Sequence, residues 1–343
     1  MSVTIKDIAK VCNVSHSTVS RVLNNKCARQ TPRTEQIIST AKALGYKPNT
    51  LAQQLVKRSS NMVGLMIPDI ANPHYSEITK CVEDAAACAG YRVFLCNTDW
   101  DVRKEQMYRD SLLESQVAGI IVMPVCDESH VMFRGLPVPV VLLGSRTLEP
   151  ELSYVVMDNE RAAHMAAEYF IGLGRRRLCY IARPVENYTS SDREKGFLAA
   201  TREAGIAAKD VAITRSKGHA LKGGYRATKQ LIEQNKTPDA ILAFNDFIAL
   251  GAIQAVEEAG LTVGEDVAVM GFDDILFSSL PKINLTTITP SNEELGKAAI
   301  LPILQQTRDD LPAKGQVKIL QPHMVLRATC GENIARKRLS IQA

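Results

Sequence analysis

Five polar side chains suited to reading nucleic-acid bases fall within one short stretch near the amino terminus. His16, Ser17, Ser20, Arg21 and Asn24 alternate with apolar residues so that they occupy the polar faces of an amphipathic helix. Their hydroxyl, imidazole, guanidinium and amide groups can form hydrogen bonds with base edges and with phosphate oxygens. His16 and Ser17 stand at the start of this helix, the end at which helix-turn-helix proteins read base edges. The stretch therefore predicts contact with DNA.

The positive charge of the chain is concentrated in the same region. Residues 1–60 hold ten Lys and Arg against two acidic residues, whereas the remaining residues hold 31 basic against 35 acidic ones. Basic side chains gathered on one domain neutralise phosphates and release counterions. A basic head on a weakly acidic body therefore favours a polyanionic partner, although a merely soluble basic surface would have the same composition.

Three short helices are needed to position these side chains. The first helix begins after Thr4, a suitable cap, and its apolar positions follow the helical period. Asn13 tolerates the positive φ of the turn that follows, and Ser15 caps the second helix. The third helix, residues 32–44, follows the cap Thr31. The pattern predicts a helix-turn-helix whose third helix closes a small core.

Three strings in this region resemble a known family, namely IKDIAKVCNV, SHSTVSRVLN and ALGYKPNTLAQQL. They resemble the DNA-binding domain of the LacI/GalR family of transcriptional regulators, which usually has glycine in the turn where this chain has Asn13. The resemblance implies a DNA-binding domain at residues 1–46. It implies DNA contacts from Thr4, Lys6, Ser15, His16, Ser17, Thr18, Ser20, Arg21, Asn24, Arg33, Asn49, Ala52, Gln53 and Leu55.

Residues 47–60 are expected to form a hinge helix and a linker. Read alone, NTLAQQLVKRSSN is a short helix that is marginal in water, followed by a polar linker. In the family that the chain resembles, this helix pushes a leucine into the minor groove, and Leu55 holds that place here. An apolar wedge between base steps kinks the duplex. Gln53 stands where family members commonly have arginine, which removes one phosphate contact; the alternative is that Leu55 is an ordinary linker residue.

Residues 61–330 are expected to form an α/β body of two lobes. Apolar runs such as MVGLMIP, AGIIVMP and AILAF alternate with helical patterns, which is typical of buried parallel strands with crossover helices. Two doubly wound parallel sheets follow, because one sheet of this length would be unusual. We expect the lobe boundary near residues 158–160 and crossovers near residues 286–320, followed by a basic tail at residues 331–343.

The body resembles the effector domain of the same family and the related periplasmic sugar-binding proteins, through PDIANPHYSEI, SDREKGF, AFNDFIALGA and GFDDI. The resemblance implies that His74 and Tyr75 pack on a ligand ring. It implies polar ligand contacts from Arg193, Asn245 and Asp273, with further ligand-facing positions at Asn187 and His219. Such groups share donors and acceptors with ligand hydroxyls. Capping of a helix is the alternative role for Asn245 and for Asp246.

Other chemistries lack support in the sequence. There is no Walker A loop, no G-x-S-x-G and no C-x-x-C, and GLGRRR lacks the third glycine of a dinucleotide fingerprint. The histidines offer no H-x-x-x-H pair. No apolar run is long enough to span a membrane. We expect no catalytic residues, no metal and no cofactor, and we assign Trp100 to burial or to an interface rather than to ligand stacking.

These features predict a bacterial LacI-type transcriptional regulator, with repression as the expected sign. It would be a cytoplasmic homodimer that binds double-stranded operator DNA and responds to a small hydroxylated effector such as a sugar, a sugar phosphate or a nucleoside. The tail lacks the leucine heptads of a coiled-coil tetramer. The alternatives are a sugar-binding transport receptor, which a secretory signal would favour, and an α/β enzyme such as a dehydrogenase.

Overall fold

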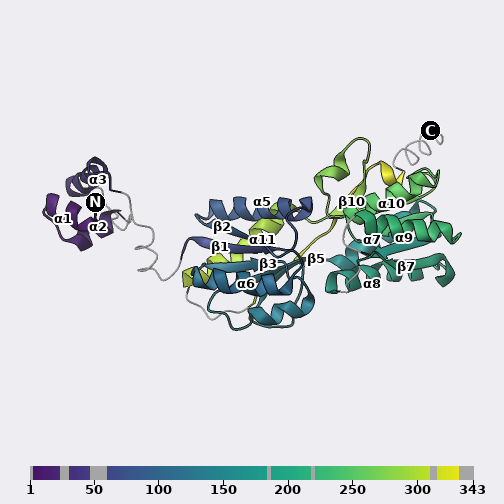
Figure 1. The fold of residues 1–343 in the computed structure, drawn as a ribbon, viewed down its shortest axis with the longest axis horizontal. Coiled ribbons are helices and arrows are strands. Elements are labelled where there is room, and N and C mark those ends of the chain that lie inside the picture. The colour runs from purple at the N-terminus through teal and green to yellow at the C-terminus, as the bar shows by residue number, and fades with distance from the viewer. Residues whose placement is uncertain are drawn as a thin grey trace. The chain divides into compact units, whose positions relative to one another are not determined.

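A computed structural model describes residues 3–23, 31–46, 60–183, 187–217, 221–309 and 315–331 of the chain (Figure 1). The contacts within the chain divide it into two units, Met1–Ser59 and Ser60–Ala343. Residues 47–59 of the predicted hinge and residues 332–343 of the tail lie outside the described residues. The same holds for the predicted site residues Asn24, Asn49, Ala52, Gln53, Leu55 and His219.

The described part of the first unit forms three helices, α1 (Ile5–Val11), α2 (His16–Leu23) and α3 (Pro32–Ala43). Each helix contributes a fully buried aliphatic side chain to a shared core: Ile8, Val19 and Ile37. The apolar period seen in the sequence is thus the face on which the three helices pack.

The turn and the caps of the first unit confirm the predicted helix boundaries. Asn13 adopts a φ of 50° between α1 and α2. Ser15 Oγ accepts a hydrogen bond from the backbone N–H of Thr18 at 3.2 Å, and Thr31 Oγ1 accepts one from the N–H of Thr34 at 3.3 Å. These bonds satisfy backbone donors that lack a partner within the helix.

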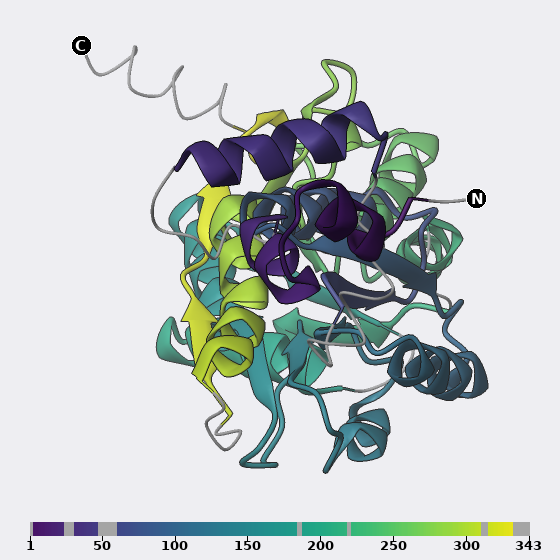
Figure 2. The same ribbon diagram turned by 90° about the vertical axis from the view of Figure 1, so that its left-hand side faces the viewer.

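The first lobe of the body is a six-stranded parallel sheet in the order β11-β5-β4-β3-β1-β2. Its strands are β1 (Met62–Ile67), β2 (Arg92–Asn97), β3 (Gly119–Val122), β4 (Val140–Leu143), β5 (Ser153–Met157) and β11 (Val317–Leu320). Its helices are α5 (Pro73–Cys88), α6 (Val102–Glu114), the 3-10 helix η1 (Asp127–Phe133) and α11 (Asn292–Asp309). Buried side chains from β1, α5 and α11 share one core cluster on one face of the sheet, and Figure 2 shows α11 and β11 side by side.

The second lobe is a six-stranded sheet in the order β12-β10-β9-β8-β6-β7. Its strands are β6 (Leu178–Ala182), β7 (Val211–Arg215), β8 (Ala240–Ala243), β9 (Ala268–Phe272), β10 (Thr286–Thr289) and β12 (His323–Val325). Its helices are α7 (Asn159–Gly172), α8 (Tyr188–Glu203), α9 (Leu221–Glu233) and α10 (Asp246–Glu258), with the 3-10 helices η2 (Ala208–Asp210), η3 (Leu276–Ser279) and η4 (Ala328–Cys330). Helices cover both faces of each sheet (Figure 1), as the predicted α/β class requires.

Two strands were not predicted, and one of them modifies the second sheet. β12 pairs antiparallel with β10, with Thr287 opposite Val325, so this sheet is parallel except at one edge. β5 was missed in the first lobe, where it joins β4 to β11. β12 has only three residues, and both strands contain partly exposed residues, so neither strand is buried along its whole length. In the described ranges, no helix is long and apolar enough to cross a membrane.

The chain passes between the two lobes three times. It leaves the first lobe between β5 and α7, returns between β10 and α11, and crosses again between β11 and β12. Two of these crossing segments are linked by the hydrogen bond from the N–H of Asp158 to the carbonyl of Leu320 at 3.0 Å. The carboxyl ends of strands in both sheets therefore meet where the segments cross.

Candidate functional site

The exposed surface of α2 carries side chains predicted to read DNA. His16, Ser17 and Arg21 are exposed, whereas Val19 and Val22 are buried in the core of the first unit. The apolar stripe therefore fixes the helix to its neighbours while its amino-terminal end presents polar groups outward. This is the arrangement that lets one helix enter a major groove.

Hydroxyl groups near the start of α1 and α2 are already engaged within the first unit. Ser15 Oγ lies 2.8 Å from Ser17 Oγ and 2.8 Å from Thr18 Oγ1. Thr4 Oγ1 donates a hydrogen bond to Asp7 Oδ2 at 2.7 Å, and this bond lowers the pKa of Asp7. Ser15 and Thr4 therefore stabilise the starts of the helices through these hydrogen bonds.

Two predicted phosphate contacts are exposed cations. Lys6 lies in the first turn of α1 and Arg33 in the first turn of α3. Ser20, in the middle of α2, is half-buried. Exposed cations at helix starts can reach phosphate oxygens without disturbing the core.

A cavity of about 380 Å³ opens between the two lobes of the body, within the range of small-molecule sites. Its lining includes all the predicted effector contacts that the structure describes: His74, Tyr75, Asn187, Arg193, Asn245 and Asp273. They come from α5 in the first lobe and from α8, α10 and the end of β9 in the second. The structure thus brings together residues that are far apart in the sequence.

Aromatic side chains form the wall of the first lobe. Asn72 caps α5, with its Oδ1 accepting from the N–H of His74 at 3.1 Å, and this cap places His74 and Tyr75 in the first turn. The Tyr75 ring makes edge contacts with His74 at 5.2 Å and with Trp100 at 6.1 Å between centroids. Trp100, which we assigned to burial or an interface, lines the cavity. The wall offers aromatic surface to a ring-shaped ligand.

Arg193 is held firmly in the second lobe. It is only 6% exposed, and its Nε donates to Asn159 Oδ1 at 2.8 Å. Its guanidinium also donates to the carbonyl of Phe244 and lies 3.7 Å from the centroid of the Phe272 ring. Burial lowers the pKa of Arg193, while the charge of Asp273 raises it. The charged group is therefore oriented by the protein before any ligand binds.

Asp273 faces the first lobe from the end of β9. Its Oδ1 lies 3.8 Å from Nδ1 of His74, a contact that links the two lobes. Burial raises the pKa of Asp273 to about 7, and burial together with the charge of Arg193 lowers the pKa of His74 to about 4. Near pH 7 the His74 ring is therefore neutral, and Asp273 is divided between its ionised and protonated forms.

Two asparagines at the cavity are helix caps as well. Asn187 Oδ1 accepts from the N–H of Ser190 at 2.9 Å at the start of α8. Asn245 Oδ1 accepts from the N–H of Ile248 at 2.9 Å at the start of α10, which confirms the capping role considered for it. Because each side-chain oxygen is used in capping, the amide N–H groups are what these residues can offer to a ligand.

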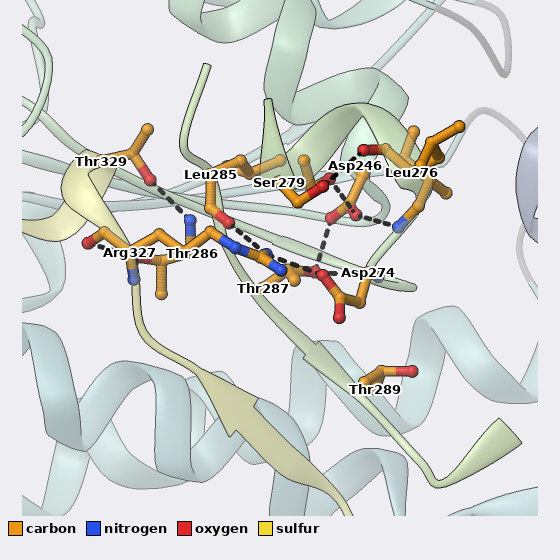
Figure 3. A network of polar contacts seen from close by, with 12 residues as sticks. Asp246, Asp274, Leu276, Ser279, Leu285, Thr286, Thr287, Thr289, Arg327 and Thr329 are labelled. Atoms are coloured by element: carbon orange, nitrogen blue, oxygen red, sulfur yellow. Dashed lines mark hydrogen bonds and ion pairs between the residues drawn. The ribbon is translucent and has the colours of Figure 1, made fainter. Parts of the chain in front are cut away.

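Asp246 does not cap α10 but fixes the loop that carries Asp273. Its buried carboxylate accepts hydrogen bonds from Thr287 Oγ1 at 2.6 Å, Ser278 Oγ at 2.7 Å and the N–H of Ile275 at 3.0 Å. Figure 3 shows it between Thr287 and the backbone beside Leu276. Burial raises the pKa of Asp246 to about 8, although the three donors lower it.

Asp274, the residue after Asp273, also holds the loop that follows β9. Arg327 Nη1 lies 2.7 Å from Asp274 Oδ1 and donates to the carbonyl of Leu285 at 2.8 Å (Figure 3). The Asp273 and Asp274 backbones adopt φ of 107° and 52°, the left-handed region that side chains disfavour. The surrounding polar network thus holds a strained turn that aims Asp273 at the cavity.

The cavity also contains residues that sequence reasoning missed. Arg183, Asp127, Asn159 and Phe244 line it, but none belongs to the predicted set. Arg183 directly follows β6, so the rule that ligands bind at the carboxyl ends of strands would have found it. Asn159 opens α7 and acts through Arg193.

Comparison with known families identifies both units. Residues 60–323 match the model "Periplasmic binding proteins and sugar binding domain of LacI family", and residues 4–49 match "Bacterial regulatory proteins, lacI family". The chain belongs to the LacI family. The cavity of this LacI-family chain lies within residues 60–323, and the helix-turn-helix lies within residues 4–49.

Individual relatives cover nearly the whole LacI-family chain. The HTH-type transcriptional regulator DegA of Bacillus subtilis is 31% identical, over 95% of this chain and 98% of its own. The ribose operon repressor of Escherichia coli is 31% identical, over 89% and 96%. A crystal structure of the lac repressor dimer bound to operator and the anti-inducer ONPF has a TM-score of 0.81 and 26% identity, over 96% and 99%. These relatives are transcriptional regulators rather than enzymes.

Proposed function

We propose that this chain is a cytoplasmic, homodimeric transcriptional repressor of a pseudo-palindromic operator, controlled by a small hydroxylated effector. The effector, a sugar, a sugar phosphate or a nucleoside, would bind between the lobes of the body. The observation that carries the proposal is the cavity lined from both lobes by groups that bind hydroxyls, in a chain that also has a helix-turn-helix. The dimer named in the lac repressor structure supports the oligomeric state.

On DNA, α2 enters the major groove and the exposed cations hold the phosphates. His16, Ser17 and Arg21 are exposed at or along this helix. Lys6 and Arg33 are exposed at the starts of the neighbouring helices. Base contacts set sequence preference, and phosphate contacts set register and overall affinity. In the proposed complex the segment with Asn49, Ala52, Gln53 and Leu55 follows into the minor groove, as its resemblance to a hinge helix implies.

In the cavity, the polar groups divide between donors and an acceptor. Arg193 and the amides of Asn187 and Asn245 supply N–H donors, and the ionised Asp273 accepts. A ligand that carries neighbouring hydroxyls can satisfy both kinds of group at once. His74 and Tyr75 pack on its apolar ring face from the other lobe.

The effector changes operator affinity by changing how the lobes meet. Several contacts already cross between them around the cavity: Asp127 Oδ2 accepts from the N–H of Tyr188 at 2.7 Å, and Glu77 Oε1 accepts from the N–H of Leu276 at 3.1 Å. A ligand shifts an equilibrium only through its different affinity for two states. An effector that touches both lobes meets that requirement, because its contacts depend on their closure.

The DNA part of the proposal is tested with the full chain and DNA recovered by in vitro selection from a random library. We expect a pseudo-palindromic consensus, bound by a dimer in analytical ultracentrifugation. Enrichment of no sequence, or binding by a monomer to a single half-site, would contradict the proposal.

The effector part is tested by operator binding in fluorescence anisotropy while candidate sugars and nucleosides are titrated. Arg193→Ala and Asp273→Ala should weaken the effector response tenfold or more, because each leaves ligand polar groups without partners. Operator affinity without effector should stay near wild type. Arg202→Ala, an exposed arginine on the same helix α8, is the matched control. A wild-type effector response in both cavity variants would show that the pocket assignment is wrong.

A further inference from the structure

Arg183 lies in the cavity between the lobes but is not among the residues predicted to contact the effector. It directly follows β6, lines the cavity and is only 6% exposed. Its guanidinium carbon lies 5.3 Å from the centroid of the Trp100 ring in the first lobe and 5.6 Å from that of the Phe244 ring in the second. The two aromatic faces hold the charged group between the lobes.

The buried guanidinium of Arg183 has no polar partner among the described residues. Its Nε makes no hydrogen bond, and no ion pair is found for it in the ranges that the structure describes. Arg193, the other arginine of the cavity, differs because it donates to Asn159 and to the carbonyl of Phe244. Burial lowers the pKa of Arg183, as expected for a cation removed from water. A buried charge is normally hydrogen-bonded to a counter-ion, and among the described residues Arg183 has none.

Three carboxylates line the same cavity, those of Asp69, Asp127 and Asp273, and in the described ranges none is hydrogen-bonded to Arg183. Asp69 accepts from the N–H of Ala71 at 3.0 Å. Asp127, the carboxylate whose charge acts most on Arg183, accepts from Ser145 Oγ at 3.2 Å and from the N–H of Tyr188 at 2.7 Å. Burial raises the pKa of Asp273, and the positive charge of Arg193 acts in the opposite direction by favouring its ionised form. Neutral ligand hydroxyls would find their partners at Arg193, Asp273 and the two asparagine amides. They would leave Arg183 without a directly bonded anion, since Asp127 acts on it only through the field of its charge.

We propose that the effector carries an acidic group, a carboxylate or a phosphate, and that Arg183 binds it. The planar guanidinium matches two oxygens of either group, and the bound anion supplies a hydrogen-bonded counter-ion. Arg183 lies between aromatic rings of both lobes, so an acidic group bound to it would lie between the lobes. Binding of that group would therefore favour the closed arrangement of the two lobes. The inference rests on the proposed function, whose effector it narrows to an acidic sugar.

Matched ligand series test this inference on the full chain by isothermal titration calorimetry. Each series contains a neutral sugar, its sugar acids and its phosphate: for example glucose, gluconate, glucuronate and glucose 6-phosphate, with equivalent series from galactose and ribose. We expect an acidic member to bind at least 30-fold more tightly than its neutral parent. Comparing the carboxylate and phosphate members within a series shows which acidic group is used.

Variants of Arg183 separate ligand binding from a structural role. Arg183→Gln should abolish the preference, so that the acidic member binds no more tightly than its neutral parent, and Arg183→Lys should keep part of the preference. Arg103→Gln, which alters an arginine whose side chain is 93% exposed, is the control and should change neither affinity. If Arg183→Gln fails to fold, Arg183→Lys still tests the prediction through its reduced preference.

The outcomes distinguish this inference from the proposed function. If neutral sugars bind and change operator affinity but their acidic partners bind no more tightly, the inference is wrong and the proposed function stands. If Arg183→Gln weakens the binding of neutral and acidic ligands equally, Arg183 has a structural role between the lobes and the inference is again wrong. If no member of any series binds or alters operator affinity, the sugar effector of the proposed function is contradicted together with the inference.

Discussion

Arg146 Nη2 and Asp192 Oδ1 lie 2.9 Å apart and join the two lobes beside the cavity. Arg146 follows β4 in the first lobe, and Asp192 stands on α8, one residue before Arg193. The guanidinium of Arg146 also lies 4.8 Å from the centroid of the Tyr188 ring. The pair therefore links the first lobe to the helix whose next residue, Arg193, lines the cavity.

Breaking this ion pair should weaken effector binding more than stability. Because the Arg146 side chain is 48% exposed, a double-mutant cycle with Arg146→Gln and Asp192→Asn should give a coupling of only about 0.5 kcal/mol in chemical denaturation. Each single variant should release the effector a few times faster, an effect that shrinks as salt rises. Stopped-flow dissociation at low and high salt measures it. Equal dissociation rates in wild type and variants at low salt would contradict the role in closure.

Gly271→Ala should disrupt the support of Asp273. A Cβ on Gly271 would lie 2.2 Å from Asp246 Oδ1 and 3.1 Å from its Cα, so the buried carboxylate would have to move. We expect a loss of about 1–3 kcal/mol in the free energy of unfolding, as for other overpacked cores. Effector affinity should fall as well, since the loop after β9 shifts.

The control for that substitution is Gly172→Ala at the end of α7. A Cβ there meets nothing within 4 Å, so stability should stay unchanged or rise by up to about 1 kcal/mol. Urea titrations of both variants make the comparison. Equal midpoints for Gly271→Ala and wild type would show that Gly271 has room for a methyl group.

Effector binding should strengthen as the pH rises from 6 to 8. Burial raises the pKa of Asp273 to about 7, so below that pH the carboxyl must release a proton before it accepts a ligand hydroxyl. The dissociation constant should then be about tenfold higher at pH 6 than at pH 8, with about fivefold of that rise falling between pH 7 and pH 6. His74, whose pKa burial lowers to about 4, stays neutral throughout. Calorimetry with a ligand that does not titrate between pH 6 and 8 measures the profile.

Asp273→Asn is the variant that assigns this pH dependence. It should bind more weakly than wild type at pH 8 and lose most of the slope. Asp246, whose pKa burial raises to about 8, is unaltered in this variant, so a slope that persists unchanged would assign the proton to Asp246 or another group. Between pH 4 and 7 the folded chain keeps a proton on Asp273 that the unfolded chain has released, because burial raises the pKa of Asp273. The contribution of Asp273 to the free energy of unfolding therefore falls as the pH rises from about 4 to 7.

Two substitutions in the first unit should have different effects on DNA binding. Lys6→Ala removes an exposed cation from each protomer and should weaken all DNA sequences alike, lowering the magnitude of the slope of log affinity against log salt by about 1.8 for the dimer, or about 0.9 per protomer. Ser17→Ala removes an exposed hydroxyl at the start of α2 and should change which bases are preferred while the salt slope stays constant. Selection and salt titration on both variants check this. Identical base preferences for Ser17→Ala and wild type would remove Ser17 from the reading surface.

Most of the fold follows from patterns that are local in the sequence. Strands such as β3, β4 and β8 are buried on both faces, so they read as continuous apolar runs. Helix starts are marked by capping residues such as Ser15 and Thr31, whose hydrogen bonds the structure confirms. β12 has three residues and lies at a sheet edge half in contact with solvent, so neither its length nor its burial leaves a clear pattern.

The cavity could be predicted only in part. His74, Arg193 and Asp273 lie within strings that resemble a family, and each lines the cavity. Trp100 and Arg183 lie outside those strings and depend on three-dimensional placement. Trp100 lines the cavity from a turn in which its φ is 59°, a backbone conformation that hydrophobic periodicity does not predict. That no described residue is hydrogen-bonded to Arg183 as a counter-ion becomes evident only when its neighbours in space are known.

The repeated crossing of the chain between the lobes also constrains how the protein can fold during its synthesis. The core of the first lobe includes Leu295, Ala299 and Ile303 from α11 and Leu320 from β11, all of which are translated after most of the second lobe. Until these residues leave the ribosome, buried strands such as β1 lack part of their apolar cover. The lobe that is translated first is therefore completed only near the end of translation. Until then the nascent chain exposes apolar surface that is prone to aggregation, and chaperones would have to cover it.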